Sequence, residues 1–492
     1  MVHPGRMMIV GGAFALVALG VSGCATVNPK QDYQRASKLI AERTGVSEAV
    51  EATTDEVVGG KVDALLSDGL SVDEAIRVAL LNNRSFQALF QTIGASRADV
   101  VQSALLTNPS VTLMARIPVP GGRTKWNVDF AQELVELWQI PVRKKIAHKQ
   151  LEQTILDVAQ QAIALSADVK ARSYELLAVR RAEATAQKHI EVSEQSLKLA
   201  QDRFKAGETS EIDVKLTRAG VLAIQLEALV LERDRQVAAA ALGRALGLSR
   251  TSKPVELKDT LPKPGGLRPD DTLVTFAVAN RIDAQIRKSQ VAASEQQLVL
   301  ERRRRFPSVM VGPAWEQPTK GASLLGPFVQ FTLPIWDQNQ AQIAKAQFLV
   351  KQRRKEHEDL LDTIALDVQQ AAAVARSAET QVLLYEQKIL PLANENVADA
   401  GRLYKAGERD IFTLIEAHDA LIIHQRQYET VLRDYALAMA ELERSVGGRL
   451  PGAAASQAQA DAAPTPEPVE VLPIPEAEPA AMERVGPPAV EE

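Results

Sequence analysis

The sequence predicts a mainly α-helical fold with a small β part, built as a tandem repeat. Apolar residues recur at coiled-coil spacing over very long stretches. Two short stretches alternate apolar and polar residues in the manner of β-hairpins. Three landmarks recur in one order at nearly one offset along the 492 residues. Each copy is therefore expected to read helix, β-hairpin, very long helix, glycine turn and helix.

A signal peptide is expected over residues 1–23. An apolar run of signal-peptide length ends at Val21, and Ser22-Gly23-Cys24 follows it directly. Small residues before a cysteine at this place are typical of a bacterial lipobox, so we expect a diacylglycerol lipid on Cys24 and a lipidated N-terminal arm over 24–69. The alternative is an ordinary signal peptide with an incidental cysteine. Cys24 is the only cysteine, which excludes a disulfide within one chain.

The first repeat is predicted over residues 70–252. Its first helix starts at a capping box, Ser71-Val72-Asp73-Glu74, and its helical pattern runs to about Leu105. A β-hairpin is expected at about 108–135, because apolar and polar residues alternate there on both sides of a Pro/Gly turn. The alternating apolar residues are Val111, Leu113, Ala115 and Ile117, then Trp126, Val128 and Phe130.

A very long helix is expected after this hairpin. No strong breaker occurs between Pro141 and Phe204, and such a helix would reach on the order of 100 Å. Its apolar residues step by four and three, as in a coiled coil. These residues are Leu151, Ile155, Val158, Ala162, Leu165 and Val169. A glycine turn at 205–213 is expected to end the helix and start another.

The second repeat is predicted over residues 269–449, after a Pro/Gly-rich linker at 253–268. Its β-hairpin is expected at about 307–334 and its glycine turn at 405–413. The offset is 198 residues between Pro109 and Pro307, and 200 residues between Gly207 and Gly407. The remaining residues, 450–492, are rich in Pro, Ala and Glu and are expected to be a disordered tail.

Aromatic side chains gather at the two predicted hairpins. All four tryptophans lie in or beside them: Trp126, Trp138, Trp315 and Trp336. Tryptophan concentrates at membrane interfaces because its ring is apolar and its N–H is polar. We therefore expect four aromatics at such an interface, namely Trp126, Phe130, Trp315 and Phe331. The alternative is that they fill a small core away from any membrane.

Several classes of function are not expected. The net charge is −5 and no block of basic residues suggests nucleic acid. No catalytic motif, metal-ligand spacing or cofactor fingerprint occurs, so neither an enzyme nor a resident metal or cofactor is expected beyond the lipid on Cys24. No stretch after the signal peptide has the roughly 20 apolar residues of a membrane-spanning helix.

The two glycine turns are expected to be exposed tips at one end of the helices. Glycine supplies the left-handed backbone that ends a helix tightly. Polar residues follow in both copies, so Gly207 and Glu208 are expected at one exposed tip, and Gly407 and Glu408 at the other. The alternative is two plain turns between antiparallel helices.

The ordered set of motifs resembles the TolC family of outer-membrane efflux proteins, in its lipidated branch. The resemblance rests on the tandem layout, the Pro-Ser-Val strand starts, Leu-Pro-Ile-Trp-Asp at 333–337, and the Lys-Ala-Gly-Glu turns. It implies a homotrimer whose hairpins form a 12-stranded transmembrane β-barrel over a long α-helical barrel. It also implies an exit duct in the outer membrane that extends into the periplasm, with a periplasmic adaptor and an inner-membrane pump as partners.

The resemblance also suggests a periplasmic gate at the tips. By position, Asp213 matches an inward-facing aspartate of the family's first repeat, and Arg409 matches a tip arginine of the second. Thr413 stands where some relatives have an acidic residue, which puts a double acidic ring in doubt. The cargo, a drug, metal ion or other compound, is not specified by any motif.

Two other functions fit parts of the sequence. A periplasmic adaptor would have one helical hairpin and a β-rich remainder, whereas two hairpins of each kind are predicted here. A coiled-coil spacer lipoprotein without a pore would explain the helices but not the tryptophan-rich alternating strands.

Overall fold

The computed structural model describes most of the chain between residues 26 and 450. The described ranges are 26–46, 55–119, 121–207, 209–248, 255–265, 267–406, 408–409 and 411–450. The chain divides into a compact unit that ends at Leu450 and a second unit, Pro451–Glu492. The predicted signal peptide, Cys24, Glu208, Gly407 and the predicted tail beyond Leu450 lie outside the described residues.

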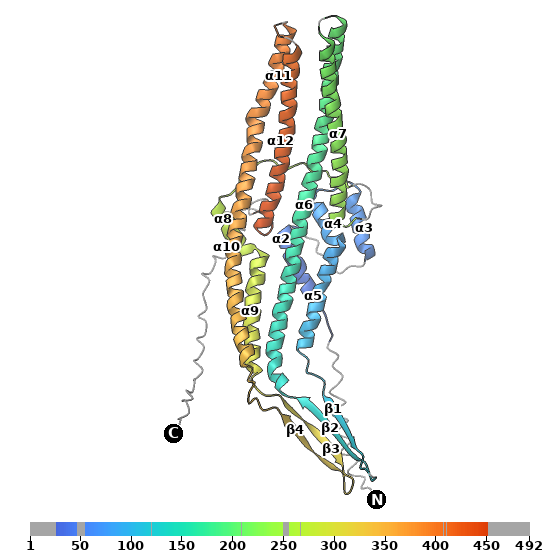
Figure 1. Ribbon diagram of the computed structural model, residues 1–492, viewed down its shortest axis with the longest axis vertical. Helices are drawn as coiled ribbons and strands as arrows, with labels where there is room; N and C mark the ends of the chain where they lie inside the picture. The colour runs from blue at the N-terminus through green and yellow to red at the C-terminus, as the bar shows by residue number, and fades with distance from the viewer. Residues whose placement is uncertain are drawn as a thin grey trace, which may run out of the picture. The chain divides into compact units, whose positions relative to one another are not determined.

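The fold is mainly helical with one small sheet, which confirms the predicted fold class, and it contains two similar halves (Figure 1). The first half consists of α4 (Val72–Asn82), α5 (Arg84–Ser103), β1 (Ser110–Arg116), β2 (Lys125–Glu133), α6 (Val135–Lys205) and α7 (Glu211–Ala245). The second half consists of α8 (Asp270–Asn280), α9 (Ile282–Arg303), β3 (Val309–Gln317), β4 (Leu324–Phe331), α10 (Gln340–Leu384), η1 (Tyr385–Ile389), α11 (Leu390–Lys405) and α12 (Ile411–Ser445).

The N-terminal arm contains two helices, α2 (Lys30–Thr44) and α3 (Asp55–Leu66). Helix α2 is fixed to α5. Arg97 donates two hydrogen bonds of 2.5 Å to the two carboxylate oxygens of Asp32, and Tyr33 stacks on Phe90 with ring centroids 5.1 Å apart. Bidentate guanidinium–carboxylate pairing fixes orientation as well as contact, so this helix is docked on the first repeat.

The predicted first helix, residues 70 to about 105, is in fact two helices that meet at Asn83. The capping box at Ser71 is present, since Ser71 accepts from the Glu74 amide and Glu74 accepts from the Ser71 amide. The break occurs because Asn83 has an extended backbone, with ψ 111°, and caps the next helix by accepting from the Phe86 amide. Asparagine competes well with helical hydrogen bonding in this way. The same break recurs at Arg281, which has ψ 130°.

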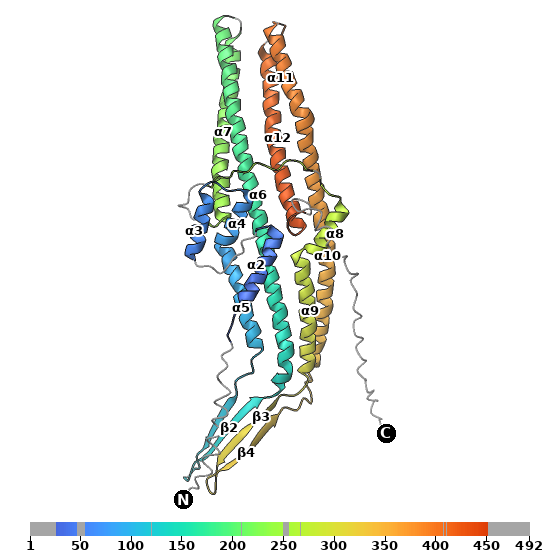
Figure 2. The same ribbon diagram turned by 180° about the vertical axis from the view of Figure 1, so that it is seen from behind.

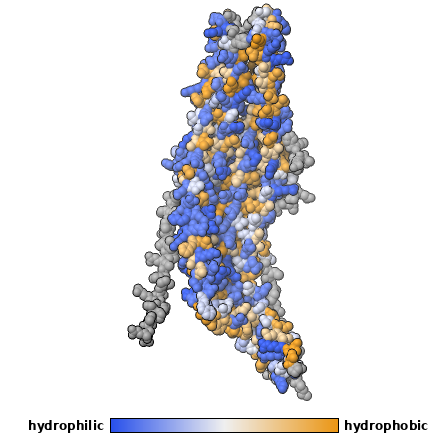
Figure 3. All heavy atoms as spheres, viewed as in Figure 1, coloured by the Kyte–Doolittle hydropathy of each residue, from blue (hydrophilic) through white to orange (hydrophobic). Residues whose placement is uncertain are grey.

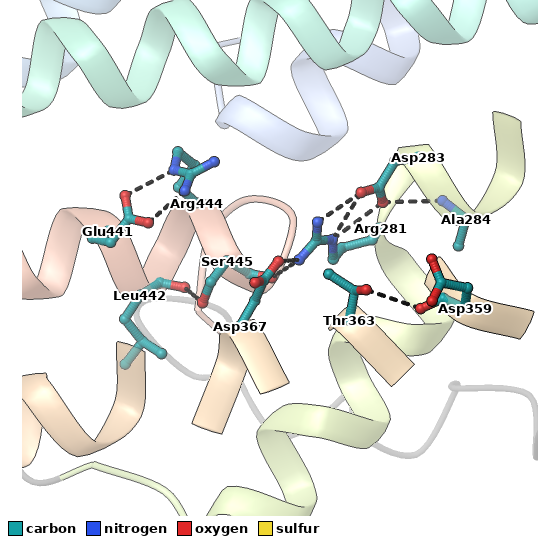
Figure 4. Close-up of polar contacts among 10 residues, drawn as sticks. All are labelled: Arg281, Asp283, Ala284, Asp359, Thr363, Asp367, Glu441, Leu442, Arg444 and Ser445. Atoms are coloured by element: carbon teal, nitrogen blue, oxygen red, sulfur yellow. Dashed lines mark hydrogen bonds and ion pairs between the residues drawn. The ribbon is translucent and has the colours of Figure 1, made fainter. Parts of the chain in front are cut away.

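At each of these two breaks, the end of the last helix of the same repeat packs against the break residue. The side-chain amide of Asn83 donates to the Ala245 carbonyl at the end of α7, at 2.9 Å. In the second repeat Arg281 takes this place and donates to the Ser445 carbonyl at the end of α12, at 3.2 Å. Arg281 also pairs with Asp283 at 2.6 Å and Asp367 at 3.0 Å, so one side chain joins α9, α10 and α12 (Figure 4).

The very long helix of the first repeat is continuous, and its coiled-coil face is buried as predicted. Helix α6 has 71 residues. Of the six predicted positions, Leu151, Ile155, Val158, Ala162 and Val169 are at most 3% exposed, and Leu165 is partly buried. The second copy differs, because the π-helix η1 separates α10 from α11. Pro391 lies two residues after the end of η1 and has no N–H for the carbonyl four residues earlier, which explains the wider turn.

The four strands form one antiparallel sheet in the order β1-β2-β3-β4. The two hairpins therefore lie side by side, with β2 of the first repeat paired to β3 of the second. That pairing runs to Asp129↔Ala314 and resumes at Gln132↔Val311. Pro313 lies in the gap and has no N–H to donate. In both ribbon views the sheet is at one end of this unit, and the α6–α7 and α11–α12 turns are at the other (Figure 2).

Where the structure describes it, the predicted linker packs on helices of both repeats. Leu257 forms an isolated parallel bridge with Leu70, and Val255, Leu257 and Leu261 are buried. Arg180 of α6 donates to the Val255 carbonyl at 3.0 Å. These contacts hold the connection between the repeats against their helical core.

Candidate functional site

The strand register puts the alternating apolar residues of both hairpins on one face of the sheet. Residues directly opposite in antiparallel strands point to the same side. Leu113 lies opposite Val128, Val128 opposite Trp315, and Trp315 opposite Leu325. The apolar residues on this face are Val111, Leu113, Ala115, Trp126, Val128, Phe130, Val309, Val311, Pro313, Trp315, Leu325, Pro327, Val329 and Phe331.

This apolar face is open to the surroundings. Leu113, Leu325 and Val329 are 64%, 69% and 60% exposed. The opposite face is more polar and carries an ion pair between Lys125 and Glu316 at 2.6 Å. A contiguous, exposed apolar face that spans all four strands marks a surface for membrane or protein contact.

Aromatic residues stand near both ends of the sheet. Trp126 and Trp315 belong to the ends of β2 and β3 that lie toward the hairpin loops. At the opposite end, Trp138 near the start of α6 packs on Phe306 just before β3, with ring centroids 5.6 Å apart. Phe331 ends β4 on this side, while Phe130 lies within β2. Two aromatic levels separated by apolar residues are typical of a layer that meets water on both sides.

In the part of the chain that the structure describes, no helix is long and apolar enough to cross a membrane.

The first tip is a tight, exposed turn at the far end from the sheet. Gly207 has φ +78° and donates to the Phe204 carbonyl at 3.0 Å. An added Cβ at this position would meet nothing within 4 Å. The turn therefore needs glycine for its backbone and not for lack of space.

Asp213 lies at this tip and caps α7. Ser210 accepts from the Asp213 amide, while the Asp213 carboxylate accepts from the Ser210 amide at 2.9 Å and the Thr209 hydroxyl at 2.7 Å. The hydrogen bonds from Thr209 and then Ser210 hold the pKa of Asp213 below its ordinary value. Its charge therefore persists to lower pH than that of a free aspartate. The motif Ser210-Glu211-Ile212-Asp213 has the same pattern as the capping box at Ser71, so the sequence contained this signal.

The second tip has the same construction as far as it is described. Ala406 donates to the Arg402 carbonyl and Glu408 to the Leu403 carbonyl, both at 3.0 Å. Glu408 and Arg409 are exposed. Arg402 pairs with Asp399 on the last turn of α11. Both tips thus present polar surface at the same end of the helices.

Between the sheet and the tips, α12 is tied to the first repeat by a polar seam that sequence analysis did not anticipate. Arg426 pairs with Glu227 of α7. Arg181 of α6 pairs with Glu429 at 2.6 Å, and His189 lies 2.5 Å from the Gln425 side chain. The charges are spread over three helices, and their proximity depends on tertiary packing, so no local motif could have indicated them.

Comparison with known proteins agrees with this architecture. The family model described as "Outer membrane efflux protein" matches residues 75–248, which is most of the first repeat. Among curated proteins, none matches the chain.

Several solved outer-membrane channels have the same fold. The channel OprN is 17% identical with a TM-score of 0.66, over 81% of this chain and 93% of OprN. The Campylobacter jejuni CmeC channel is 13% identical with a TM-score of 0.65, over 84% of this chain and 91% of that one. The open-state MtrE channel of Neisseria gonorrhoeae is 17% identical with a TM-score of 0.61, over 77% of this chain and 89% of that one.

The match spans helices α4 to α7 with the hairpin between them, and the fold shared with these channels extends through the second repeat. The chain is therefore similar to outer membrane efflux proteins in the sequence of its first repeat, and to these solved channels in its fold.

Proposed function

We propose that this chain forms the outer-membrane exit duct of a tripartite efflux pump. The observation that carries the proposal is the two-faced sheet, whose apolar face is exposed and continuous across both repeats. The helices run from one end of this sheet to two turns at the far end of the unit (Figure 1), and these turns are the polar tips. A chain with one face for lipid and a long helical part can guide cargo from the periplasm to the exterior.

The sheet of one chain is incomplete as a membrane structure. Strands β1 and β4 each have one neighbouring strand among the described residues. An open strand edge in lipid leaves backbone groups without hydrogen bonds, at several kcal/mol each. Three copies with four strands each would close twelve strands into a ring. A homotrimer is therefore the assembly that we propose.

The first prediction tests the duct. Purified protein in detergent should have three times the mass of one chain by mass photometry, and it should produce conductance steps in a planar bilayer. A spacer lipoprotein without a pore would give no conductance. A stable monomer or dimer, or a trimer without conductance, would contradict the proposed function.

The tips are proposed as the contact with a periplasmic adaptor and as the gate. Gly207, Glu208, Gly407 and Glu408 are the proposed docking residues; Asp213 and Arg409 are the proposed gate. Three symmetry-related Asp213 carboxylates would attract cations at a narrow mouth. An exposed pair with Arg409 would contribute only roughly 0–1 kcal/mol, but three copies together would favour a closed state that adaptor docking opens.

The second prediction separates the charge of Asp213 from its capping role. Asp213→Asn keeps an oxygen that can accept from Ser210 and Thr209 but removes the charge. This variant should weaken the block by multivalent cations added on the periplasmic side, while Arg409→Ala should raise single-channel conductance. Both variants should keep the helical circular dichroism of the parent. Unchanged cation block and conductance would mean that the tips are plain turns.

A lipid on Cys24 is proposed as the anchor of the arm that leads to α2. The third prediction is that Cys24→Ser abolishes incorporation of labelled palmitate, because the thioether can form only on the thiol. Trimers should still form, since the sheet and helices do not depend on the lipid. Label retained by the serine variant would show that the lipobox interpretation is wrong.

A further inference from the structure

The end of the sheet that carries the hairpin loops has an excess of positive charge. Arg116 ends β1 and Lys125 begins β2. The loops add Arg123 in the first hairpin and Lys320 in the second, and both of these residues are exposed. Glu316 is the only acidic residue in 116–125 and 316–324. Four basic residues against one acidic residue leave this end of one chain with a charge of +3.

Arg116 and Lys125 lie on the polar face of the sheet. They are directly opposite each other in adjacent strands, and their neighbour Glu316 lies opposite Asn127 on the same face. Successive residues of a strand alternate between its two faces, so these side chains point away from the face that carries Leu113. Hydrophilic residues reach the surface of the sheet beside hydrophobic ones (Figure 3). Because we propose that the apolar face meets lipid, the basic pair lies on the side that would enclose the duct.

The two cations share one carboxylate. Lys125 Nζ lies 2.6 Å from Glu316 Oε1, and these two side chains are 29% and 33% exposed. Arg116 is exposed, and no ion pair joins it to a carboxylate in the part of the chain that the structure describes. Like charges directly opposite in neighbouring strands destabilise a sheet. The pair therefore does not serve the stability of the hairpin, and the Arg116 guanidinium is available to an anion.

Acidic residues of the same face lie toward the other end of the sheet. Asp129 is four residues from Lys125 along β2, and Glu133 ends this strand. At about 3.4 Å per residue, Asp129 is about 14 Å from Lys125 along the strand. Electrostatic interactions in water are screened over about 8 Å at physiological ionic strength. The basic end and the acidic end of this face therefore act separately on a passing ion.

The acidic tip at Asp213 is too far away to cancel the positive charge. Helix α6 has 71 residues, so it separates the sheet from the first tip by on the order of 100 Å. That distance is roughly ten times the screening length in physiological salt. A duct built from this chain would thus be acidic at the tips and basic at its outer end.

We propose that Arg116 and Lys125 form an anion site inside the outer end of the duct, and that the cargo carries carboxylate groups. The proposal rests on the proposed trimeric duct. Lys125 already holds one carboxylate, that of Glu316. A guanidinium presents two parallel N–H donors that match the two oxygens of a carboxylate. The site would therefore attract an anion that has passed along the duct and repel a cation.

Three copies would repeat this site around one axis. Twelve strands about 4.8 Å apart and tilted by about 40° form a barrel with a radius of about 12 Å. Long side chains on its inner face then extend well toward the axis. Charges of one sign in a narrow passage with low-dielectric walls raise the local concentration of ions of the other sign. Six basic side chains, two from each copy, would act on every ion that leaves.

Reversal potentials in a planar bilayer test the site in the full-length trimer. In a KCl gradient, Arg116→Gln and Lys125→Gln should each lower the ratio of chloride to potassium permeability by about twofold or more, because each removes three charges from the ring. Glu316→Gln should raise this ratio. Arg116→Lys keeps the charge and should keep the ratio of the parent chain. The matched control is Lys61→Gln, which removes an exposed positive charge on α3, away from the sheet, and should leave the ratio unchanged.

Citrate, a trivalent carboxylate, gives a second measurement that depends on the side of the membrane. Citrate added on the side of the hairpin loops should block the current of the parent chain. The concentration for half block should rise about tenfold in Arg116→Gln, as expected for the loss of one charge-assisted hydrogen bond. Citrate added on the side of the tips should affect the parent chain and this variant alike, because the substituted residue lies at the other end.

The outcomes separate the anion site from the duct. Lower permeability ratios and weaker citrate block in both glutamine variants of the basic pair, with Arg116→Lys and Lys61→Gln unchanged, support the site. Unchanged ratios and unchanged block in variants that still conduct overturn the site and leave the duct intact. An equal shift in Lys61→Gln also overturns the site, because the effect would then follow net charge alone. Absence of trimers and of conductance in the parent chain overturns the duct, and the site with it.

Discussion

Gly247→Ala is expected to cause the largest loss of stability among the Gly→Ala changes at two similar contacts. At these contacts the ends of α7 and α12 each pack against the break between the first two helices of their repeat. Gly247 ends α7 with φ +71°, and an added Cβ would lie 2.6 Å from the Asn82 carbonyl oxygen and 2.9 Å from the Asn83 Cα. Left-handed strain costs about 1–2 kcal/mol, and forcing apart main-chain atoms adds about 1–3 kcal/mol. The neighbouring atoms are backbone and cannot rotate away.

The matched control is Gly207→Ala. Gly207 has a similar φ of +78°, but an added Cβ there meets nothing within 4 Å. Its loss should therefore be limited to strain, about 1–2 kcal/mol. Thermal unfolding followed by circular dichroism would compare the two variants with the parent chain. Equal losses of stability in the two variants would show that the close approach of Gly247 to the backbone at Asn82 and Asn83 adds no cost beyond the left-handed strain.

Gly207→Trp is expected to abolish efflux while leaving the trimer in place. The tip is exposed and open, so the indole has space in the isolated protein and the fold loses only the strain of the left-handed turn. The same indole would occupy the surface at which we propose that an adaptor docks. Cells that depend on this chain should accumulate the exported compound as cells without the chain do.

Two controls separate docking from folding in that experiment. Gly60→Trp adds the same bulk on α3, where a Cβ also meets nothing within 4 Å, and should retain efflux. Gly207→Ala has the strain without the bulk and should retain it too. Normal efflux in Gly207→Trp, with the variant present in the membrane, would rule out this tip as an adaptor contact.

Local and periodic features of the fold could be predicted from the sequence. The fold class, the long helices and the coiled-coil face of α6 followed from apolar spacing, because a helix that buries one face must repeat apolar residues every three to four positions. The alternation within each strand followed in the same way from the twofold period of a β-strand. The capping box at Ser71 followed from the fixed geometry of a helix start.

Interruptions of the helices were only partly evident from the sequence. The break at Asn83 has a local cause in asparagine capping, and the π-helix has one in Pro391, yet both stand within otherwise helical patterns. A helical period tolerates such a local change because the residues on both sides continue to bury the same face. The capping role of Asp213 belongs to the same class, since Ser210-x-x-Asp213 is a local signal.

Contacts between distant segments were decided by the tertiary structure alone. The pairing of β2 with β3 makes two separate alternating patterns into one apolar face, and a shift by one residue would have mixed the faces. Two sets of polar contacts join residues that are 86 or more positions apart. Arg281 contacts Asp367 and Ser445, and Arg426 pairs with Glu227. Sequence periodicity specifies which face of an element is apolar; which partner covers that face depends on packing between elements, which no local spacing encodes.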